Sequence, residues 1–252
     1  MAHDALEIVV LGCVLGLGAL LQSAVGFGMA LFAIPLLVMA GRPLPIAVAL
    51  TLGAAVVQTT YGSYVVRDRI RWPRAVSFAA IQCVTLVPGV ACMGLLVERD
   101  TTAIKQAVGV AVLLVVTVQI VVRPAPRERL AIGWTLAAAS AAGFLSGLVG
   151  MGGPPLVLYA LAHSWSRDTF RAFLWSQFLI VLPILGGVLA VRFGAQILAS
   201  MALGAAMAPI VWAGSRLGLA ATAHWDRRRL QIAASIMLYA IALAAVIGPY
   251  VG

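Results

Sequence analysis

The stretch SGLVGMGGPP, from Ser146 to Pro155, lies in the middle of an apolar run of about 35 residues. A second stretch, QSAVGFG from Gln22 to Gly28, lies in the middle of another run of about the same length. As one straight helix, either run would be roughly 52 Å long, whereas the hydrocarbon core of a bilayer is about 30 Å thick. Glycine permits backbone conformations that interrupt a helix. We therefore expect each run to break at its glycines.

The composition indicates a membrane protein. Of the 252 residues, 63% are hydrophobic and 10% are charged, whereas soluble domains are roughly half apolar and a quarter charged. No stretch remains for a soluble domain, so residues 1–252 are expected to form a single, all-α, polytopic membrane domain. The apolar segments are predicted at about 6–40, 44–66, 74–97, 102–122, 130–163, 170–191, 195–217 and 230–250.

The two glycine breaks lie at matching places in the two halves of the chain. The triplets that start at Gly26 and Gly150 are 124 residues apart. The chain is therefore predicted to contain two diverged repeats of about 125 residues, over about 6–122 and 130–250. Each repeat would consist of a glycine-broken helix, either re-entrant or doubled into two short spans, followed by three transmembrane helices.

The positions of the basic residues predict how the repeats are oriented. If each long segment crosses once, the 17 Lys and Arg residues divide eight to nine between the two sides. If both long segments double back, thirteen lie on one side, and Arg42, Arg99, Lys105 and Arg192 lie on the other. Short cytoplasmic loops carry an excess of Lys and Arg. The second arrangement therefore predicts inverted repeats with both termini outside the cytoplasm.

A broken membrane helix is a candidate anion site. Non-helical backbone is tolerated in a bilayer only against protein or water, and the start of a half-helix presents unpaired N–H groups and a positive dipole. Neutral amides and hydroxyls add donors that bind an oxyanion without trapping it. The predicted substrate-binding residues are Gln22, Ser23, Gly26, Phe27, Gly28, Gln58, Gln82, Ser146, Gly150, Gly152, Gly153, Pro154 and Gln177.

Structural roles are the alternative for these residues. A polar side chain inside a membrane helix can bond to a neighbouring helix, and glycines four residues apart let two helices pack closely. Three such glycine pairs are predicted to be packing sites: Gly12 and Gly16, Gly143 and Gly147, and Gly214 and Gly218.

Other kinds of chemistry find less support in the sequence. All eight acidic residues lie at segment ends or in loops, so no carboxylate is available in the membrane to relay protons or sodium ions. Ser146 lies in GFLSG, which is not a GxSxG motif, and no histidine lies at a comparable depth, so an intramembrane enzyme is not expected. No metal site and no cofactor are predicted. An anion channel lined by the same glutamines stays an open alternative.

The segment AAGFLSGLVGMGGPPLVLYAL, residues 141–161, resembles the signature G-x-x-S-G-x-x-G-x-G-G-P of the sulfite exporter TauE/SafE family, also called toluene sulfonate uptake permeases. Residues 25–51 resemble the first repeat of that family, although Met29 and Ala30 stand where smaller residues are common. The resemblance implies a multi-pass transporter of sulfite, organosulfonates or related sulfur oxyanions in the bacterial inner membrane, working by alternating access. Uptake of another small organic anion is the alternative to export.

The expected partners follow from charge. An anion leaving a cell with a negative interior gains about 2.3 kcal/mol per 100 mV, which favours export. Both termini are predicted to be periplasmic. The basic residues are scattered over short loops, so anionic lipid headgroups, and not nucleic acid, are expected to bind them. The sequence does not decide whether the protein forms a homodimer.

Overall fold

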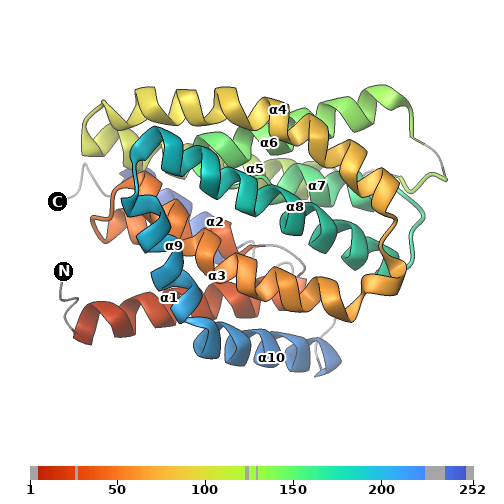
Figure 1. The fold of residues 1–252 in the computed structure, drawn as a ribbon, viewed down its shortest axis with the longest axis horizontal. Coiled ribbons are helices and arrows are strands. Elements are labelled where there is room, and N and C mark those ends of the chain that lie inside the picture. Colours follow the sequence, from red (N-terminus) through yellow and green to blue (C-terminus); the bar gives the residue numbers. More distant parts are fainter. Residues whose placement is uncertain (1–4, 26–27, 123–124, 129, 225–235, 248–252) are drawn as a thin grey trace.

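The computed structural model describes residues 5–25, 28–122, 125–128, 130–224 and 236–247, and helices make up most of them (Figure 1). Of the described helices, six are long and apolar enough to cross a membrane, or up to seven if one bent pair counts as a single span. The expected all-α membrane class is confirmed. The helices are α1 (Ala5–Val25), α2 (Met29–Met39), α3 (Leu44–Val65), α4 (Trp72–Val97), α5 (Thr101–Val121), α6 (Ile132–Val149), α7 (Gly153–Leu161), α8 (Arg167–Phe193), α9 (Gln196–Ala206) and α10 (Ala208–His224), with a 3-10 turn at Arg67–Arg69 and a last helix at Ile236–Ile247.

The first long segment doubles back as a hairpin of α1 and α2. The start of α2 packs on the middle of α1, where Gly18 faces Met29. The chain then returns to the level at which α1 began, because Arg42 Nη2 lies 2.7 Å from Glu7 Oε2. The returning limb has 11 residues and is about 16 Å long, too short to cross the bilayer.

The second long segment doubles back in the same way. Its returning limb α7 has 9 residues and is about 14 Å long. The two ends of this hairpin are joined by backbone hydrogen bonds: Arg127 N donates to Ala162 O at 2.9 Å, and Ser164 N donates to Arg127 O at 3.1 Å. In both hairpins a limb of spanning length is thus followed by a limb too short to span the bilayer. Neither long segment therefore forms two short full spans, which was the other arrangement open from the sequence.

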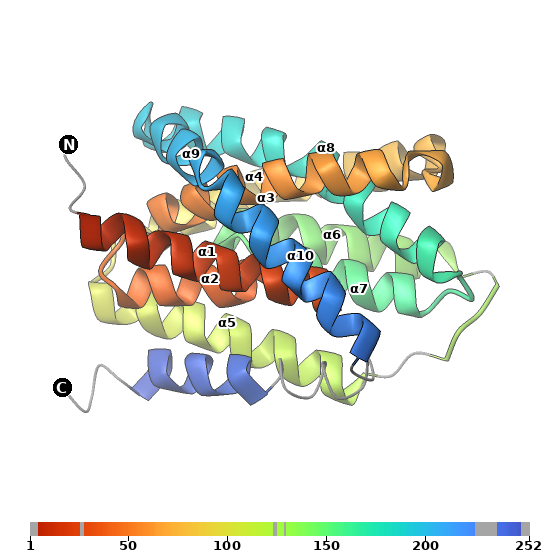
Figure 2. The same cartoon turned by 90° about the horizontal axis from the view of Figure 1, so that it is seen from below.

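The two hairpins start from opposite ends of the helix bundle (Figures 1 and 2). Each one packs on a helix from the other half of the chain: α1 lies along α10, and α6 lies along α4. Helices α3 and α8, one from each half, also pack against each other. The two halves are therefore interlocked.

Glycines allow these helix pairs to approach closely. A Cβ atom at Gly143 or Gly147 of α6 would collide with the carbonyl oxygens of Gln82 and Leu86 in α4. The α1–α10 contact is similar, since a Cβ at Gly214 would meet the backbone of α1. All three predicted glycine pairs lie in such interfaces, where Gly12 and Gly16 face Ile210, and Gly218 faces Leu20.

One predicted span is bent. The segment predicted at 195–217 forms α9 and α10, which meet at Met207 with an angle of 54°. Pro209 explains the bend, because its nitrogen has no hydrogen to donate to the carbonyl four residues earlier, and its ring crowds that carbonyl. Of the last predicted segment, 230–250, the structure describes the helix Ile236–Ile247.

Candidate functional site

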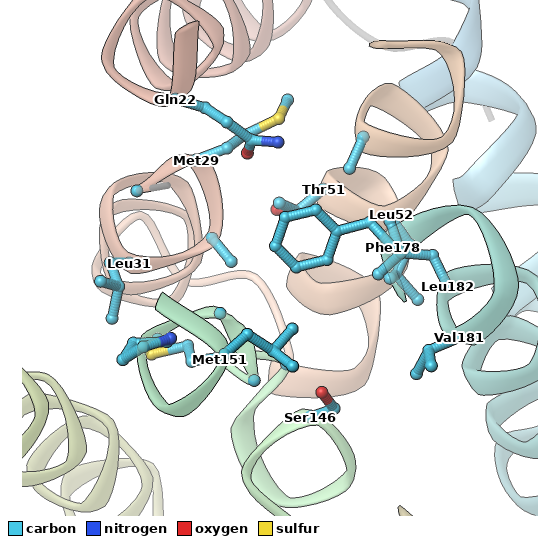
Figure 3. Close-up of a pocket in the computed structure, with 18 of the residues that line it drawn as sticks. Gln22, Met29, Leu31, Thr51, Leu52, Ser146, Met151, Phe178, Val181 and Leu182 are labelled. Carbon is cyan, nitrogen blue, oxygen red and sulfur yellow. The ribbon is translucent and has the colours of Figure 1, made fainter. Parts of the chain in front are cut away.

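The tips of the two hairpins meet at a cavity of about 50 Å³ in the middle of the bundle (Figure 3). Helices α3, α4 and α8 complete its walls. Eight of the predicted site residues line it: Gln22, Gly28, Gln82, Ser146, Gly150, Gly152, Gly153 and Pro154.

The first break is narrower than the sequence predicted. Helix α1 continues to Val25, so Gln22 and Ser23 lie in its last turns and not in the break. Gly28 has a φ of 124° and precedes α2, whose first internal hydrogen bond runs from Phe32 N to Gly28 O at 2.9 Å. No side chain caps the start of α2. The predicted residues Gly26 and Phe27 lie outside the residues that the structure describes.

The second break is a left-handed glycine cap (the αL motif) followed directly by a new helix. Gly150 has a φ of 74°, its N–H donates to Ser146 O at 2.9 Å, and Met151 N donates to Leu145 O at 3.2 Å. Gly152 comes next, and a Cβ there would collide with the Ser146 hydroxyl. Helix α7 then begins at Gly153. Its first turn contains Pro154 and Pro155, where a missing N–H costs nothing.

The polar side chains of the two hairpins face each other across the cavity. Gln22 is 6% exposed and Ser146 is 7% exposed, and Figure 3 shows the amide of the first and the hydroxyl of the second directed into the space between α1 and α6. Gln82, on α4, is also buried and lines the cavity. The described residues that line the cavity include no charged side chain. The site therefore offers neutral donors.

Gln177 links two helices by hydrogen bonds and is not part of the cavity wall. Its Oε1 accepts a hydrogen bond of 2.7 Å from Gln82 Nε2, and its own Nε2 donates to Ala75 O at 3.1 Å. These bonds join α8 to α4, which is the interhelical alternative considered for polar residues in a membrane. Gln177 does not line the cavity. Its bond to Gln82 uses one of the two hydrogens on Gln82 Nε2 and leaves the second available.

Ser23 and Gln58 lie together at a second cavity. Gln58 Nε2 lies 3.0 Å from Ser23 Oγ, 2.8 Å from Ser215 Oγ and 3.2 Å from Ala19 O. This cavity has a volume of about 140 Å³, and Gln22 lines it as well as the first. The predicted polar residues are thus divided between two adjoining cavities.

The sequence reasoning missed the apolar wall of the first cavity and one polar residue. The wall includes Met29, Met151 and Phe178, whose ring lies at the centre of the view in Figure 3. Thr51 also lines the cavity, but its hydroxyl donates to Ala47 O at 2.8 Å and therefore has no proton left to give an anion. Thr51 could have been found, because it lies seven residues before Gln58 and hence on the same face of α3.

Among the described residues, no three His, Cys, Asp or Glu side chains lie close enough together to hold a metal ion. The polar side chains among the residues lining the cavity carry amide and hydroxyl groups.

Comparisons with known proteins bear on the same region. A family model described as "Sulfite exporter TauE/SafE" matches residues 10–245, a range that contains most of the first hairpin, all of the second and every residue lining the first cavity. Searches of curated proteins and of solved structures found no match.

Proposed function

The chain belongs to the sulfite exporter TauE/SafE family, and from this premise we propose that it exports a small sulfur oxyanion, sulfite or a close relative, across the bacterial inner membrane. The observation that carries the proposal is the cavity at which the two hairpin tips meet. It brings together two helix starts and three neutral side-chain donors from segments that are far apart in the sequence.

The helix starts favour a negative charge in the cavity. Met29 and Gly153, the first residues of α2 and α7, both line it. The first N–H groups of a helix have no partner inside the helix, and the start of a helix carries about half a positive charge. Because Pro154 and Pro155 have no N–H, α7 offers fewer donors than α2. An anion would therefore bind more closely to the first hairpin.

The side chains add donors without adding charge. Gln22 supplies an amide, Ser146 supplies a hydroxyl, and Gln82 has a second N–H beyond its bond to Gln177. A carrier has to release its substrate as well as bind it. Neutral hydrogen bonds contribute about 0.5–1.5 kcal/mol each, so several of them hold an oxyanion reversibly.

The size of the cavity favours a small anion. A buried water needs about 10–15 Å³ of cavity volume. A cavity of about 50 Å³ therefore holds roughly four water-sized groups, which matches the one sulfur and three oxygen atoms of sulfite. An aromatic sulfonate would need a more open conformation. We expect small oxyanions to be transported in preference to aromatic sulfonates.

The arrangement of the hairpins supports alternating access. They start from opposite ends and each packs on a helix of the other half, as two inverted repeats would. In transporters built in this way, one repeat moves against the other around a central site. With the arginine-rich end of the bundle in the cytoplasm, the membrane potential would drive a bound anion outward. Both termini would then be periplasmic.

The experiment is flux in proteoliposomes at a set membrane potential. Sulfite, methanesulfonate, toluenesulfonate, acetate and phosphate would be loaded in turn, and efflux would be measured against protein-free vesicles. We expect saturable sulfite efflux that increases with an inside-negative potential. Absence of flux for every anion would refute transport. Flux that rises linearly with concentration, at channel-like rates, would establish the channel alternative.

A further inference from the structure

The second cavity adjoins the first, because Gln22 lines both. It is enclosed by the end of α1, the end of α3, the first turns of α8 and the middle of α10, and its volume is about 140 Å³. The polar residues Gln22, Ser23, Gln58 and Ser215 line it, together with Arg171 and Arg216. The proposed function assigns no role to this cavity.

The hydrogen bonds around Gln58 leave donors available to a ligand. The side chain is 6% exposed, and its Nε2 is within bonding distance of the hydroxyl oxygens of Ser23 and Ser215. The neighbouring Ala19 carbonyl, at 3.2 Å, can only accept, which places the nitrogen of the amide on this side. The Gln58 nitrogen has two hydrogens for these three oxygens and cannot itself accept, so neither serine gives its own proton to Gln58. Two hydroxyl donors are thus held next to the cavity.

The placement of Gln58 is costly for the fold. Its Oε1 is buried and has no hydrogen-bond partner among the described residues. An unsatisfied buried acceptor destabilises a protein by about 1–3 kcal/mol. Packing alone therefore does not explain why a glutamine occupies this position. The hydrogen bonds by which Gln58 orients the two serines do explain it.

The charge on the cavity selects for an anion. Arg171 lies in the first turns of α8, and the guanidinium of Arg216 lies over the Trp212 ring, 5.4 Å from the ring centre. The described residues that line the cavity include no acid. Most of the remaining wall is apolar, including Trp175. Positive charge in a cleft with walls of low dielectric concentrates anions there.

Gln22 connects this cavity to the first, since it lines both. We propose that the second cavity is a separate binding site for the same class of small oxyanion, a vestibule from which the anion passes Gln22 to reach the site between the hairpin tips. This proposal rests on the proposed function for the onward step, but anion binding in the vestibule can be tested without transport. In the proposed topology the vestibule faces the cytoplasm, where an exported anion begins its path.

The test uses tryptophan fluorescence, because Trp175 and Trp212 both line the vestibule. The purified full-length chain in detergent would be titrated with sodium sulfite, with sodium chloride as the control for ionic strength. We expect a saturable change in fluorescence that the double variant Trp175→Phe/Trp212→Phe lacks. In Arg171→Gln/Arg216→Gln the affinity should fall by about tenfold or more, since charge-assisted hydrogen bonds are lost. Arg192→Gln, whose arginine lies at the other end of the bundle beside Gly94, is the matched control and should bind like the wild type.

The absence of a saturable change in the wild type would overturn the vestibule. Equal sulfite affinity in the double arginine variant and the wild type would overturn it as well. An anionic lipid headgroup presents similar oxyanion chemistry, so the titration is repeated with a soluble short-chain phosphatidylglycerol. A response to the lipid together with none to sulfite would also refute the small-anion site. If Arg171→Gln/Arg216→Gln exports sulfite with wild-type kinetics, the vestibule is refuted and the proposed function stands. If the wild type binds sulfite normally but shows no efflux, transport alone is refuted.

Discussion

In the proposed carrier, Gln22 and Ser146 would bind an anion without the help of a charged side chain. The two residues come from the two hairpins, both are buried, and both line the central cavity. An amide and a hydroxyl do not titrate near neutral pH, so their donors are present whatever the cytoplasmic pH. The binding free energy would be shared by several modest hydrogen bonds. Removal of one donor should therefore weaken binding without abolishing it.

Replacement of Gln22 by alanine tests this expectation. The Gln22→Ala variant should show a KM for sulfite efflux raised by roughly two- to tenfold, the effect of losing one neutral hydrogen bond of about 0.5–1.5 kcal/mol. Thermal unfolding in detergent should confirm that the variant is folded. Thr60→Val is the control, because the Thr60 hydroxyl is exposed and donates to Val56 O at 2.8 Å, on the same helix. Wild-type kinetics in Gln22→Ala would remove Gln22 from the site.

The turn between α6 and α7 depends on two glycines for two different reasons. Gly150 adopts a φ of 74°, which side chains other than glycine rarely allow. Gly152 has an ordinary φ of −78°, but the Ser146 hydroxyl and the Ala142 carbonyl oxygen occupy the place of its missing Cβ. This close contact sets the distance between the tip of α6 and the start of α7. The geometry of the anion site therefore depends on the turn.

A methyl group at position 152 should disturb this hairpin. Gly152→Ala is expected to destabilise the protein by about 1–3 kcal/mol, because the added atom meets backbone and a buried hydroxyl. Gly187→Ala is the matched control: Gly187 lies inside α8, a Cβ added there would meet nothing within 4 Å beyond its own helix, and alanine favours a helix by about 1 kcal/mol. Thermal unfolding in detergent compares the two. Equal unfolding temperatures for Gly152→Ala and the wild type would contradict the close contact.

The basic residues separate toward the two ends of the bundle. Arg69 and Arg74 lie beside α8 near its start, where Arg171 lines the vestibule. At the opposite end Arg42 pairs with Glu7 at the start of α1. The positions of these four arginines agree with the thirteen-to-four division of Lys and Arg in the sequence, which predicts that the first end is cytoplasmic.

Cysteine labelling tests the orientation in cells. In a background with Cys13, Cys83 and Cys92 replaced by alanine, a membrane-impermeant maleimide should label Arg42→Cys from the periplasm. Arg69→Cys should react after the inner membrane is permeabilised, and not before. The reverse pattern would place the termini in the cytoplasm and would contradict both the inverted-repeat prediction and the cytoplasmic position of the vestibule.

Much of the helical architecture was predictable because its signals are local. The apolar runs placed α3, α4, α5 and α8 within a few residues of their observed bounds, and the glycines marked both breaks. The errors arose where a tertiary contact or a single residue overrides hydropathy. Helix α1 extends past Gln22, and the predicted span at 195–217 bends at Met207. Hydropathy averaged over a window of many residues predicts neither the end of α1 nor the bend at Met207.

The sequence by itself determined that the chain is an all-helical membrane protein with two glycine-broken segments, because hydropathy, run length and glycine content belong to each segment separately. The tertiary structure alone decided which polar residues meet. Gln58 bonds to Ser215, 157 residues away, and Gln82 bonds to Gln177, whereas Gln22 and Ser146 face each other across the central cavity. Such meetings depend on the rotation of each helix about its axis and on how closely the glycine interfaces pack, and a linear pattern of apolar residues specifies neither.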